Sequence, residues 1–464
     1  MKQSSELTGR VLNSGDPGWD DARHGFGARF DYDANQPSAV VFAETTDDVV
    51  NAVKYARAAG LPLRARCGRH NYQGYSSLVK GGVIVDVSEL DQVSVSSDRT
   101  SAVVGAGLDM LTLTEKLADV GLGLPLATGP SVGLAGLTQG GGFGITSRRY
   151  GLMCDNVSSF EIVDANGEIL EASTTNHPDL FWALRGGGGG NFGVVTRLTL
   201  TPYPIGMVGA FNITWQWSDF EAVVQKWQEW SWNAPNAITS LLTLHVDGTV
   251  RMEGQFTPDP QDLPSLGEVL APMLSNPAPI TIQIMVVPSI IAARMTFGVD
   301  PLAPEWAVKP HDDTQLFKST SAIAPDFLPA EGIASMKKWL ESVPPLSAMP
   351  SQASMIQLLG GGGKASEPAT DATAIFYRKA KMVVQYDGYW TAPEDAQPTI
   401  DWVVAMRKSL LPYAHGAYVN YQDDTLGDDW LQQYYADNLP RLQKIKKQYD
   451  PTNFFKFPQS IPPA

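Results

Sequence analysis

Residues 131–144, with the sequence SVGLAGLTQGGGFG, decide the fold because they carry six glycines within fourteen positions. So many glycines weaken a regular helix or strand, and they suit a segment that another molecule must approach closely. A second cluster, Gly186–Gly190, comes shortly before a β-branched run at 194–200 that predicts a strand. One such cluster alone would be interpreted as turns, but two in one half of the chain favour a cradle for a cofactor.

The common phosphate-binding fingerprints are absent from these clusters. The chain contains no G-x-x-x-x-G-K-[ST] loop, and residues 140–144 lack the G-x-G-x-x-G spacing between a strand and a helix. Backbone N–H groups in glycine-rich turns bind a pyrophosphate without either fingerprint. The sequence therefore predicts a cofactor site that is neither a P-loop nor a nicotinamide-type dinucleotide fold.

Around the first cluster, helix and strand signals alternate. Thr45 precedes two acidic residues and an amphipathic run that stops at Gly60, which predicts a capped helix. Strands are expected at 83–87, 93–95 and 102–104, and a further helix at 111–120.

The pattern of the sequence changes after Pro202-Tyr203-Pro204, where we place a domain boundary. Strands are expected at 241–250 and 280–287, and a third glycine cluster lies at 360–363. The tail from 434 to 451 predicts a helix, with Leu439, Leu442 and Ile445 on one face and the basic residues on its solvated face.

Composition excludes several classes of protein. The 464 residues include 49 acidic and 34 basic side chains, so the net charge of −15 disfavours nucleic acid or an anionic membrane as partner. Two cysteines cannot form a disulfide framework, and the six histidines show no metal-pair spacing, so no metal site is predicted. With a polar N-terminus and no apolar run of about 18 residues, a cytoplasmic protein is expected.

Two polar motifs stand out as candidate functional residues. Arg64, Arg66 and Arg69 with His70 supply forked donors suited to phosphate or carboxylate. The run at 418–424, YVNYQDD, is strand-like and offers tyrosines that act as general bases if their pKa falls from about 10. Taken alone, a lone histidine and a strand tyrosine are more often structural.

Four segments in order resemble the berberine-bridge-enzyme-like oxidases of the vanillyl-alcohol oxidase superfamily. These segments are RCGRHNYQGYSSLVKGGVIVDVSEL at 66–90, TGPSVGLAGLTQGGGFGITSRRYGLMCDN at 128–156, DLFWALRGGGGGNFGVVT at 179–196, and YVNYQDD at 418–424 leading to KKQYDPTNFF at 446–455. The resemblance spans nearly the whole chain. It implies an α+β fold with an FAD-binding domain at 1–204, completed by 421–464. The substrate-binding domain at 205–420 is expected to be an antiparallel sheet covered by helices.

The resemblance also implies residue roles. His70 matches the histidine that bonds covalently to FAD, Tyr421 is the candidate general base, and Gln385 matches a polar position near the substrate. The cofactor-binding residues that it implies are His70, Arg66, Gly68, Arg69, Asn71, Gly74, Gly129, Val132, Gly133, Gly136, Gly141, Val195, Asn420 and Tyr421.

Several positions depart from the family pattern. Gly129 replaces the cysteine that gives many relatives a second covalent link, so one link through His70 is expected. Arg69 replaces a glycine and puts an arginine side chain near the flavin, while Phe143 and Val383 replace residues that assist the base in plant relatives. Val132 occupies a position at which valine admits dioxygen, which favours an oxidase.

Three functions remain open at this point. The first is oxidation of a small organic substrate (an alcohol, a sugar or a secondary metabolite) by hydride transfer to FAD, with dioxygen reduced to hydrogen peroxide. The second is a dehydrogenase that passes electrons to a quinone or a protein. The third is a flavin-binding protein that has lost catalysis. The substrate and the oligomeric state are not readable from the sequence.

Overall fold

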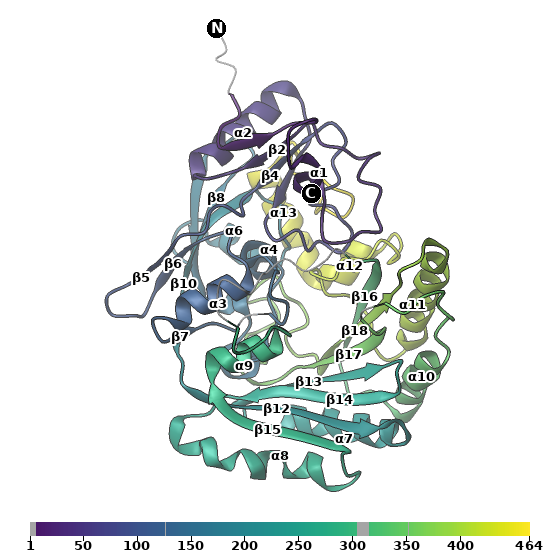
Figure 1. Ribbon diagram of the computed structural model, residues 1–464. Coiled ribbons are helices and arrows are strands. Elements are labelled where there is room, and N and C mark those ends of the chain that lie inside the picture. The colour runs from purple at the N-terminus through teal and green to yellow at the C-terminus, as the bar shows by residue number, and fades with distance from the viewer. Residues whose placement is uncertain (1–5, 126, 304–314, 351) are drawn as a thin grey trace.

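The structure is a computed structural model that describes residues 6–464, except 126, 304–314 and 351. Figure 1 shows two small sheets in the upper part of the molecule and one large sheet below them. The C-terminal helices, in yellow, return to the upper part and lie beside elements formed by the first 200 residues.

The upper part contains a four-stranded and a five-stranded sheet. The first has the order β1-β2-β4-β3, with parallel pairs on both sides of β4. Its strands are β1 (Arg10–Leu12), β2 (Ala39–Phe42), β3 (Leu63–Arg66) and β4 (Val83–Asp86). The second is antiparallel and has the order β5-β6-β10-β8-β9. Its strands are β5 (Val93–Val95), β6 (Ala102–Gly105), β8 (Val157–Val163), β9 (Ile169–Ser173) and β10 (Val194–Leu200).

Helices pack around these sheets and between them. They are α1 (Trp19–Arg23), α2 (Thr46–Ala59), α3 (Met110–Ala118), α4 (Leu134–Gln139), α5 (Ser147–Tyr150), α6 (Pro178–Ala183), α12 (Trp430–Tyr435) and α13 (Leu439–Tyr449). The predicted helix after Thr45 is confirmed as α2. Thr45 and Asp48 form a reciprocal capping box at its start, and Gly60 ends it in the left-handed conformation.

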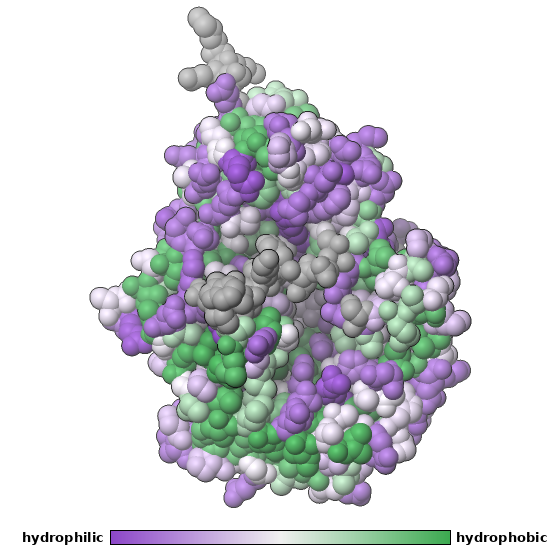
Figure 2. Space-filling view, in the orientation of Figure 1, coloured by the Kyte–Doolittle hydropathy of each residue, from purple (hydrophilic) through white to green (hydrophobic). Residues whose placement is uncertain are grey.

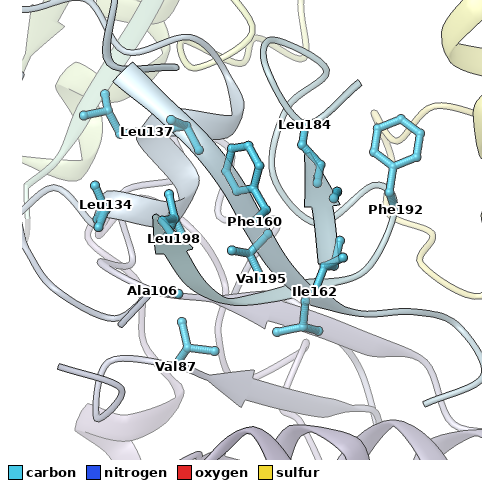
Figure 3. Close-up of a cluster of buried hydrophobic side chains, with 14 of the residues drawn as sticks. Val87, Ala106, Leu134, Leu137, Phe160, Ile162, Leu184, Phe192, Val195 and Leu198 are labelled. Atoms are coloured by element: carbon cyan, nitrogen blue, oxygen red, sulfur yellow. The ribbon is translucent and has the colours of Figure 1, made fainter. Parts of the chain in front are cut away.

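One apolar core joins the upper elements. Figure 3 shows part of it, with Leu134 and Leu137 of α4 beside Phe160 of β8 and Leu198 of β10. Side chains of α12 and α13 belong to the same core. The tail therefore packs against the sheets formed by the first 200 residues. No helix in the described part of the chain is both long and apolar enough to cross a lipid bilayer.

The lower part is built on a seven-stranded antiparallel sheet of order β15-β12-β14-β13-β17-β18-β16. Its strands are β12 (Met207–Gln216), β13 (Ile238–His245), β14 (Thr249–Phe256), β15 (Thr281–Pro288), β16 (Phe317–Ala324), β17 (Met355–Gly360) and β18 (Met382–Tyr389). Its helices are α7 (Phe220–Asn233), α8 (Leu266–Ser275), α9 (Ser289–Thr296), α10 (Ala330–Glu341) and α11 (Ala396–Leu410). The expected α+β fold with a helix-covered antiparallel sheet is confirmed.

The two faces of this sheet have different surroundings. Because side chains alternate along a strand, Val384 and Tyr386 of β18 enter the helix-covered core. Gln385 and Asp387 point to the opposite face, toward the upper part of the molecule. At one edge the sheet shows hydrophobic side chains to solvent, and Figure 2 shows hydrophobic residues gathered low on this face of the molecule.

Three expectations from sequence were wrong in detail. Residues 241–250 form a hairpin turn rather than one strand, because Asp247 and Gly248 join β13 to β14. Residues 418–424 form turns rather than a strand. Lys446 does not lie on a solvated face, because it is fully buried and donates to Asp450 and to two backbone carbonyls.

The third glycine cluster has a structural role. Gly362 and Gly363 pack directly on Arg148, where an added Cβ would come within 2.3 Å of Arg148 atoms. The buried Arg148 guanidinium donates to the carbonyls of Ile238, Gly361 and Ala234. This arginine thereby ties α5 of the upper part to the large sheet.

A short two-stranded sheet connects the two parts. It pairs β7 (Leu122–Gly123) with β11 (Tyr203–Pro204), next to the boundary expected from the sequence.

Candidate active site

A cavity of about 450 Å³ lies between the large sheet and the upper part of the molecule. Four stretches from distant parts of the sequence form its upper wall: 65–72, 127–139, 188–195 and 418–422. Side chains of β17 and β18 form the opposite wall. The first two glycine clusters and both polar motifs of the sequence therefore meet in one place.

The loop after β3 is shaped by internal hydrogen bonds. The Arg66 guanidinium donates to Asp86 at 2.6 Å, and both side chains are fully buried. Asn71 accepts from the backbone N–H groups of Gln73 and Tyr75, and Gly74 adopts a positive φ of 67° that completes the turn. The motif thus folds into a tight loop that ends at the cavity wall.

The three arginines of this motif direct their charges away from the cavity. Arg66 pairs with Asp86, Arg64 donates to the carbonyl of Lys456, and Arg69 donates to the carbonyl of Asp21. Arg66 and Arg69 still contribute to the wall. The Arg69 guanidinium itself is engaged at Asp21. Backbone N–H groups of this loop, rather than the arginine side chains, are the available donors for a phosphate group.

His70 lies in the cavity wall between two neighbours. Its Nε2 is 2.7 Å from the Oγ of Ser131, and its ring stacks on Phe26 with centroids 4.2 Å apart. The imidazole is therefore fixed in position at the edge of the space.

The glycine-rich segments leave room that side chains would fill. An added Cβ at Gly136 would meet no atom within 4 Å, and one at Gly189 would lie 3.6 Å from the Cα of Gly136. The backbones of the two glycines thus lie close together, and Gly136 borders open space. This open cradle, with His70 beside it, fits a flat cofactor such as FAD.

The other positions implied by the resemblance fall into two groups. Those that line the cavity with His70 and Gly136 are Arg66, Gly68, Arg69, Asn71, Gly129, Val132, Gly133, Val195, Asn420, Tyr421 and Gln385. Gly74 and Gly141 lie outside the wall. Gly141 packs against Ile375 with φ 118°, so it shapes the turn behind the cradle.

The loop 418–424 is tied to both neighbouring segments. Asn420 donates from Nδ2 to the carbonyl of Leu137 at 3.0 Å, at the end of α4. Asn71 donates to Gln422 Oε1 at 2.5 Å. These bonds hold Tyr421 beside the loop that carries His70.

Tyr421 sits in an aromatic cluster. It stacks on Tyr72 and meets Tyr418 edge-on, with ring centroids 5.2 Å and 4.9 Å away. Burial raises the pKa of Tyr421 well above its usual value, and neighbouring tyrosines and Asp387 raise it further. Tyr421 is therefore a neutral phenol near pH 7. Removal of a proton from a substrate beside it needs an anionic group nearby that accepts the proton.

Asp387 supplies such an anionic group. Burial raises its pKa to about 6, so the carboxyl group is mainly ionised at pH 7. Its Oδ2 accepts from Gln385 Nε2 at 2.9 Å, and the hydroxyl group of Ser319, paired with Asp387 across β16 and β18, also lowers its pKa. A buried carboxylate in a cavity wall is a candidate partner for a ligand's hydroxyl group.

Sequence reasoning missed Asp387 and Tyr72. The signal for Asp387 was present, because MVVQYDGY places one carboxylate on the same strand face as Gln385 within an otherwise apolar run. Tyr72 follows His70 by two positions, but nothing local distinguishes it from a structural tyrosine.

The substrate side of the cavity is rich in amides and aromatic rings. Gln357 and Gln385 are paired across β17 and β18, and Gln315 and Gln352 line the same space. Among the described residues of this wall, Asp387 is the one acidic side chain. The lining therefore matches a neutral, hydroxyl-bearing molecule.

Fold and cavity together define a two-domain flavoprotein oxidoreductase. A sequence profile described as "FAD binding domain" matches residues 37–173, and one described as "Berberine and berberine like" matches residues 417–462. The chain belongs to the berberine-bridge-enzyme-like FAD-linked oxidoreductases, a family of enzymes.

Individual relatives match along almost the full chain. The uncharacterized FAD-linked oxidoreductase YgaK of Bacillus subtilis (strain 168) is 35% identical over 99% of this chain and 98% of its own. A carbohydrate oxidase of Microdochium nivale is 28% identical over 92% and 88%. The solved structure of Physcomitrella patens BBE-like 1 superposes with a TM-score of 0.89 at 28% identity, covering 99% of this chain and 98% of that one.

Proposed function

We propose that this enzyme oxidises an alcohol group of a small, neutral, polyhydroxylated substrate of the sugar class. FAD bound by residues 1–204 and 421–464 would accept the hydride, and dioxygen would then be reduced to hydrogen peroxide. Residues 205–420 would hold the substrate. The observation that carries the proposal is the buried Asp387 carboxylate, the one acidic side chain among the described residues of this amide-lined cavity.

The proton step is assigned to Tyr421 and Asp387 together. Tyr421 contacts the reacting hydroxyl group, and the ionised Asp387 carboxylate accepts the proton that this hydroxyl group releases, so the proton ends on Asp387. Gln385 donates to Asp387 and so fixes the orientation of the carboxylate. The raised pKa of Tyr421 supports this division, because the phenol alone is a poor base at neutral pH.

The lining supports the substrate class. Amide groups both donate and accept hydrogen bonds, which suits hydroxyl groups, and the rings of Tyr72, Phe317 and Tyr389 offer flat apolar surfaces. An anionic substrate is disfavoured because the guanidinium groups of Arg66 and Arg69 are engaged elsewhere. The Microdochium nivale relative, described as a carbohydrate oxidase, agrees with this choice.

The proposed covalent link to FAD involves His70 alone. Gly129 has no side chain to form a second link. Cys67 also lines the cavity, but burial raises the pKa of its thiol to about 12, and the thiol donates to the carbonyl of Ala106. A neutral, hydrogen-bonded thiol is unreactive.

The test combines two measurements on the holoprotein. Mono- and oligosaccharides, sugar alcohols, aromatic alcohols and sugar acids are mixed anaerobically with the enzyme, and bleaching of the flavin is followed. Air is then admitted, and hydrogen peroxide is measured. We expect bleaching by neutral sugars and stoichiometric peroxide. Bleaching confined to aromatic alcohols or to sugar acids would overturn the substrate class, and slow reoxidation in air would overturn the oxidase assignment.

A further inference from the structure

A second cavity, of about 700 Å³, lies at the junction of the two parts of the molecule. Helix α3 and the β7–β11 pair form one side of it, and α9 with the ends of β12 and β14 forms the other. It adjoins the first cavity, which is lined by His70 and Asp387, because Ala127 and Phe297 line both cavities. The substrate-side residues Gln385 and Asp387 do not line it.

Ion pairs hold the walls of this second cavity in place. Arg294 of α9 donates to Glu115 of α3 at 2.6 Å, and both side chains are largely buried. Arg149 contacts Asp259 at 2.6 Å and also donates to the carbonyl of Thr257. The space is thus bounded by fixed contacts between the two parts of the chain.

The lining favours a neutral, ring-shaped ligand. The hydroxyl groups of Thr114, Ser289 and Thr296 each donate to a backbone carbonyl, of Met110, Gly206 and Ala292 respectively. These donors are therefore engaged within the protein, which leaves mainly apolar surface for a ligand. The rings of Tyr150 and Tyr203 lie parallel with centroids 3.5 Å apart, which adds a flat aromatic surface to the wall.

From this arrangement we infer that the second cavity binds a neutral organic electron acceptor of the quinone class. This inference rests on the proposed flavin chemistry and adds an acceptor to dioxygen. The acceptor lies behind the shared wall of Ala127 and Phe297, apart from the substrate. Reduced flavin delivers two electrons and two protons, and the quinone becomes a hydroquinone while the flavin returns to its oxidised form.

The experiment fills the second cavity with a larger side chain, introduced from one wall or from the other. Ala293→Phe on α9 and Ala118→Phe on α3 each place a ring into the space, and Ala271→Phe on the exposed side of α8 is the matched control. The flavin of each holoprotein is reduced photochemically without substrate, and its reoxidation by menadione or by dioxygen is followed by stopped flow. Menadione binding to the oxidised holoprotein is followed separately by quenching of tryptophan fluorescence.

We expect both cavity-filling variants to lose about tenfold or more in the menadione rate and to lose saturable menadione binding. Their dioxygen rates and all properties of the control should match the wild type. A wild-type menadione rate in the filled variants would overturn the inference, as would an equal loss with dioxygen. If wild-type reduced flavin resists dioxygen but reacts with menadione, the oxidase proposal fails while this inference stands.

Discussion

Tyr72 and Tyr421 stack face to face, with ring centroids 5.2 Å apart and ring planes inclined by only 6°. Tyr72 follows His70 in the loop after β3, and Tyr421 lies in the C-terminal loop. The stack therefore places the candidate proton-transfer group at a fixed position relative to the candidate flavin attachment site. A rigid aromatic pair of this kind positions a hydroxyl group at low entropic cost.

Replacing Tyr421 by phenylalanine removes the hydroxyl group and keeps the stack. We expect the rate of flavin reduction by substrate to fall by about a hundredfold or more, the size of effect typical of a general base. Stopped-flow measurement under anaerobic conditions gives this rate directly. Unfolding in urea serves as the control and should change little. Reduction at the wild-type rate would exclude Tyr421 from the proton step.

Replacing Asp387 by asparagine removes the charge and keeps the shape. The wild-type rate of flavin reduction should rise with pH through about 6, since Asp387 must lose its proton to act. In Asp387→Asn the rate should fall about a hundredfold or more and lose this rising limb. Gln357→Glu, which adds a carboxylate elsewhere in the wall, is the comparison. An unchanged pH profile in Asp387→Asn would place the base elsewhere.

The same aspartate links stability to pH. Its pKa is raised from 3.8 to about 6 in the folded protein. The folded state therefore binds this proton more tightly than the unfolded state, and stability falls as pH rises from about 4 through 6. Above that range the buried charge costs up to about 3 kcal/mol, from 1.36 kcal/mol per pKa unit. Urea unfolding at pH 8 should thus show Asp387→Asn to be more stable than the wild type, with the gain shrinking toward pH 4. The prediction fails if the difference in unfolding free energy between Asp387→Asn and the wild type is smaller at pH 8 than at pH 4.

Local signals in the sequence predicted much of the upper part of the fold. The capping pattern at Thr45 and the β-branched run at 83–87 each specify their own structure, and both appear as expected. The prediction of one strand at 241–250 overlooks Asp247-Gly248, a dipeptide that is typical of two-residue hairpin turns. The pairing of β13 with β14 on either side of this dipeptide shows the hairpin.

The site was harder to predict because its geometry depends on contacts between distant segments. The resemblance supplied His70 and Tyr421, which the structure brings to one cavity. No residue near Arg66 in the sequence indicates that its guanidinium forms an ion pair with Asp86 of the neighbouring strand. Likewise, the raised pKa of Asp387 follows from burial beneath another part of the chain, which no sequence pattern encodes.

The attachment of the flavin can be checked by its colour. When the wild-type protein is precipitated with acid, we expect the yellow colour to remain in the pellet, because we propose that His70 holds FAD covalently. His70→Ala should release the colour to the supernatant. His177→Ala, whose imidazole contacts Tyr449 away from the cavity, is the control and should keep it. Colour released from the wild type would refute the covalent link.

Lys318 of β16 connects the large sheet to the loop that carries Tyr421. It is fully buried and lies 2.5 Å from Asp423 Oδ1 and 2.8 Å from Asp424 Oδ1. Burial alone would raise the pKa of Asp423, but the charge and hydrogen bond of Lys318 lower it on balance. Removing the lysine leaves a buried carboxylate without its counter-ion.

Lys318→Met should therefore lower the free energy of unfolding by about 3–5 kcal/mol, the cost typical of breaking a buried ion pair. Because Tyr421 lies two residues from Asp423, flavin reduction should slow as well. Lys364→Met is the matched control, since its partner Glu367 is exposed and such surface pairs contribute about 0–1 kcal/mol. Urea unfolding measures both variants. Equal stability of the two would mean that the buried pair does not anchor the loop, and normal flavin reduction in a destabilised Lys318→Met would mean that Tyr421 is positioned by its stack on Tyr72 alone.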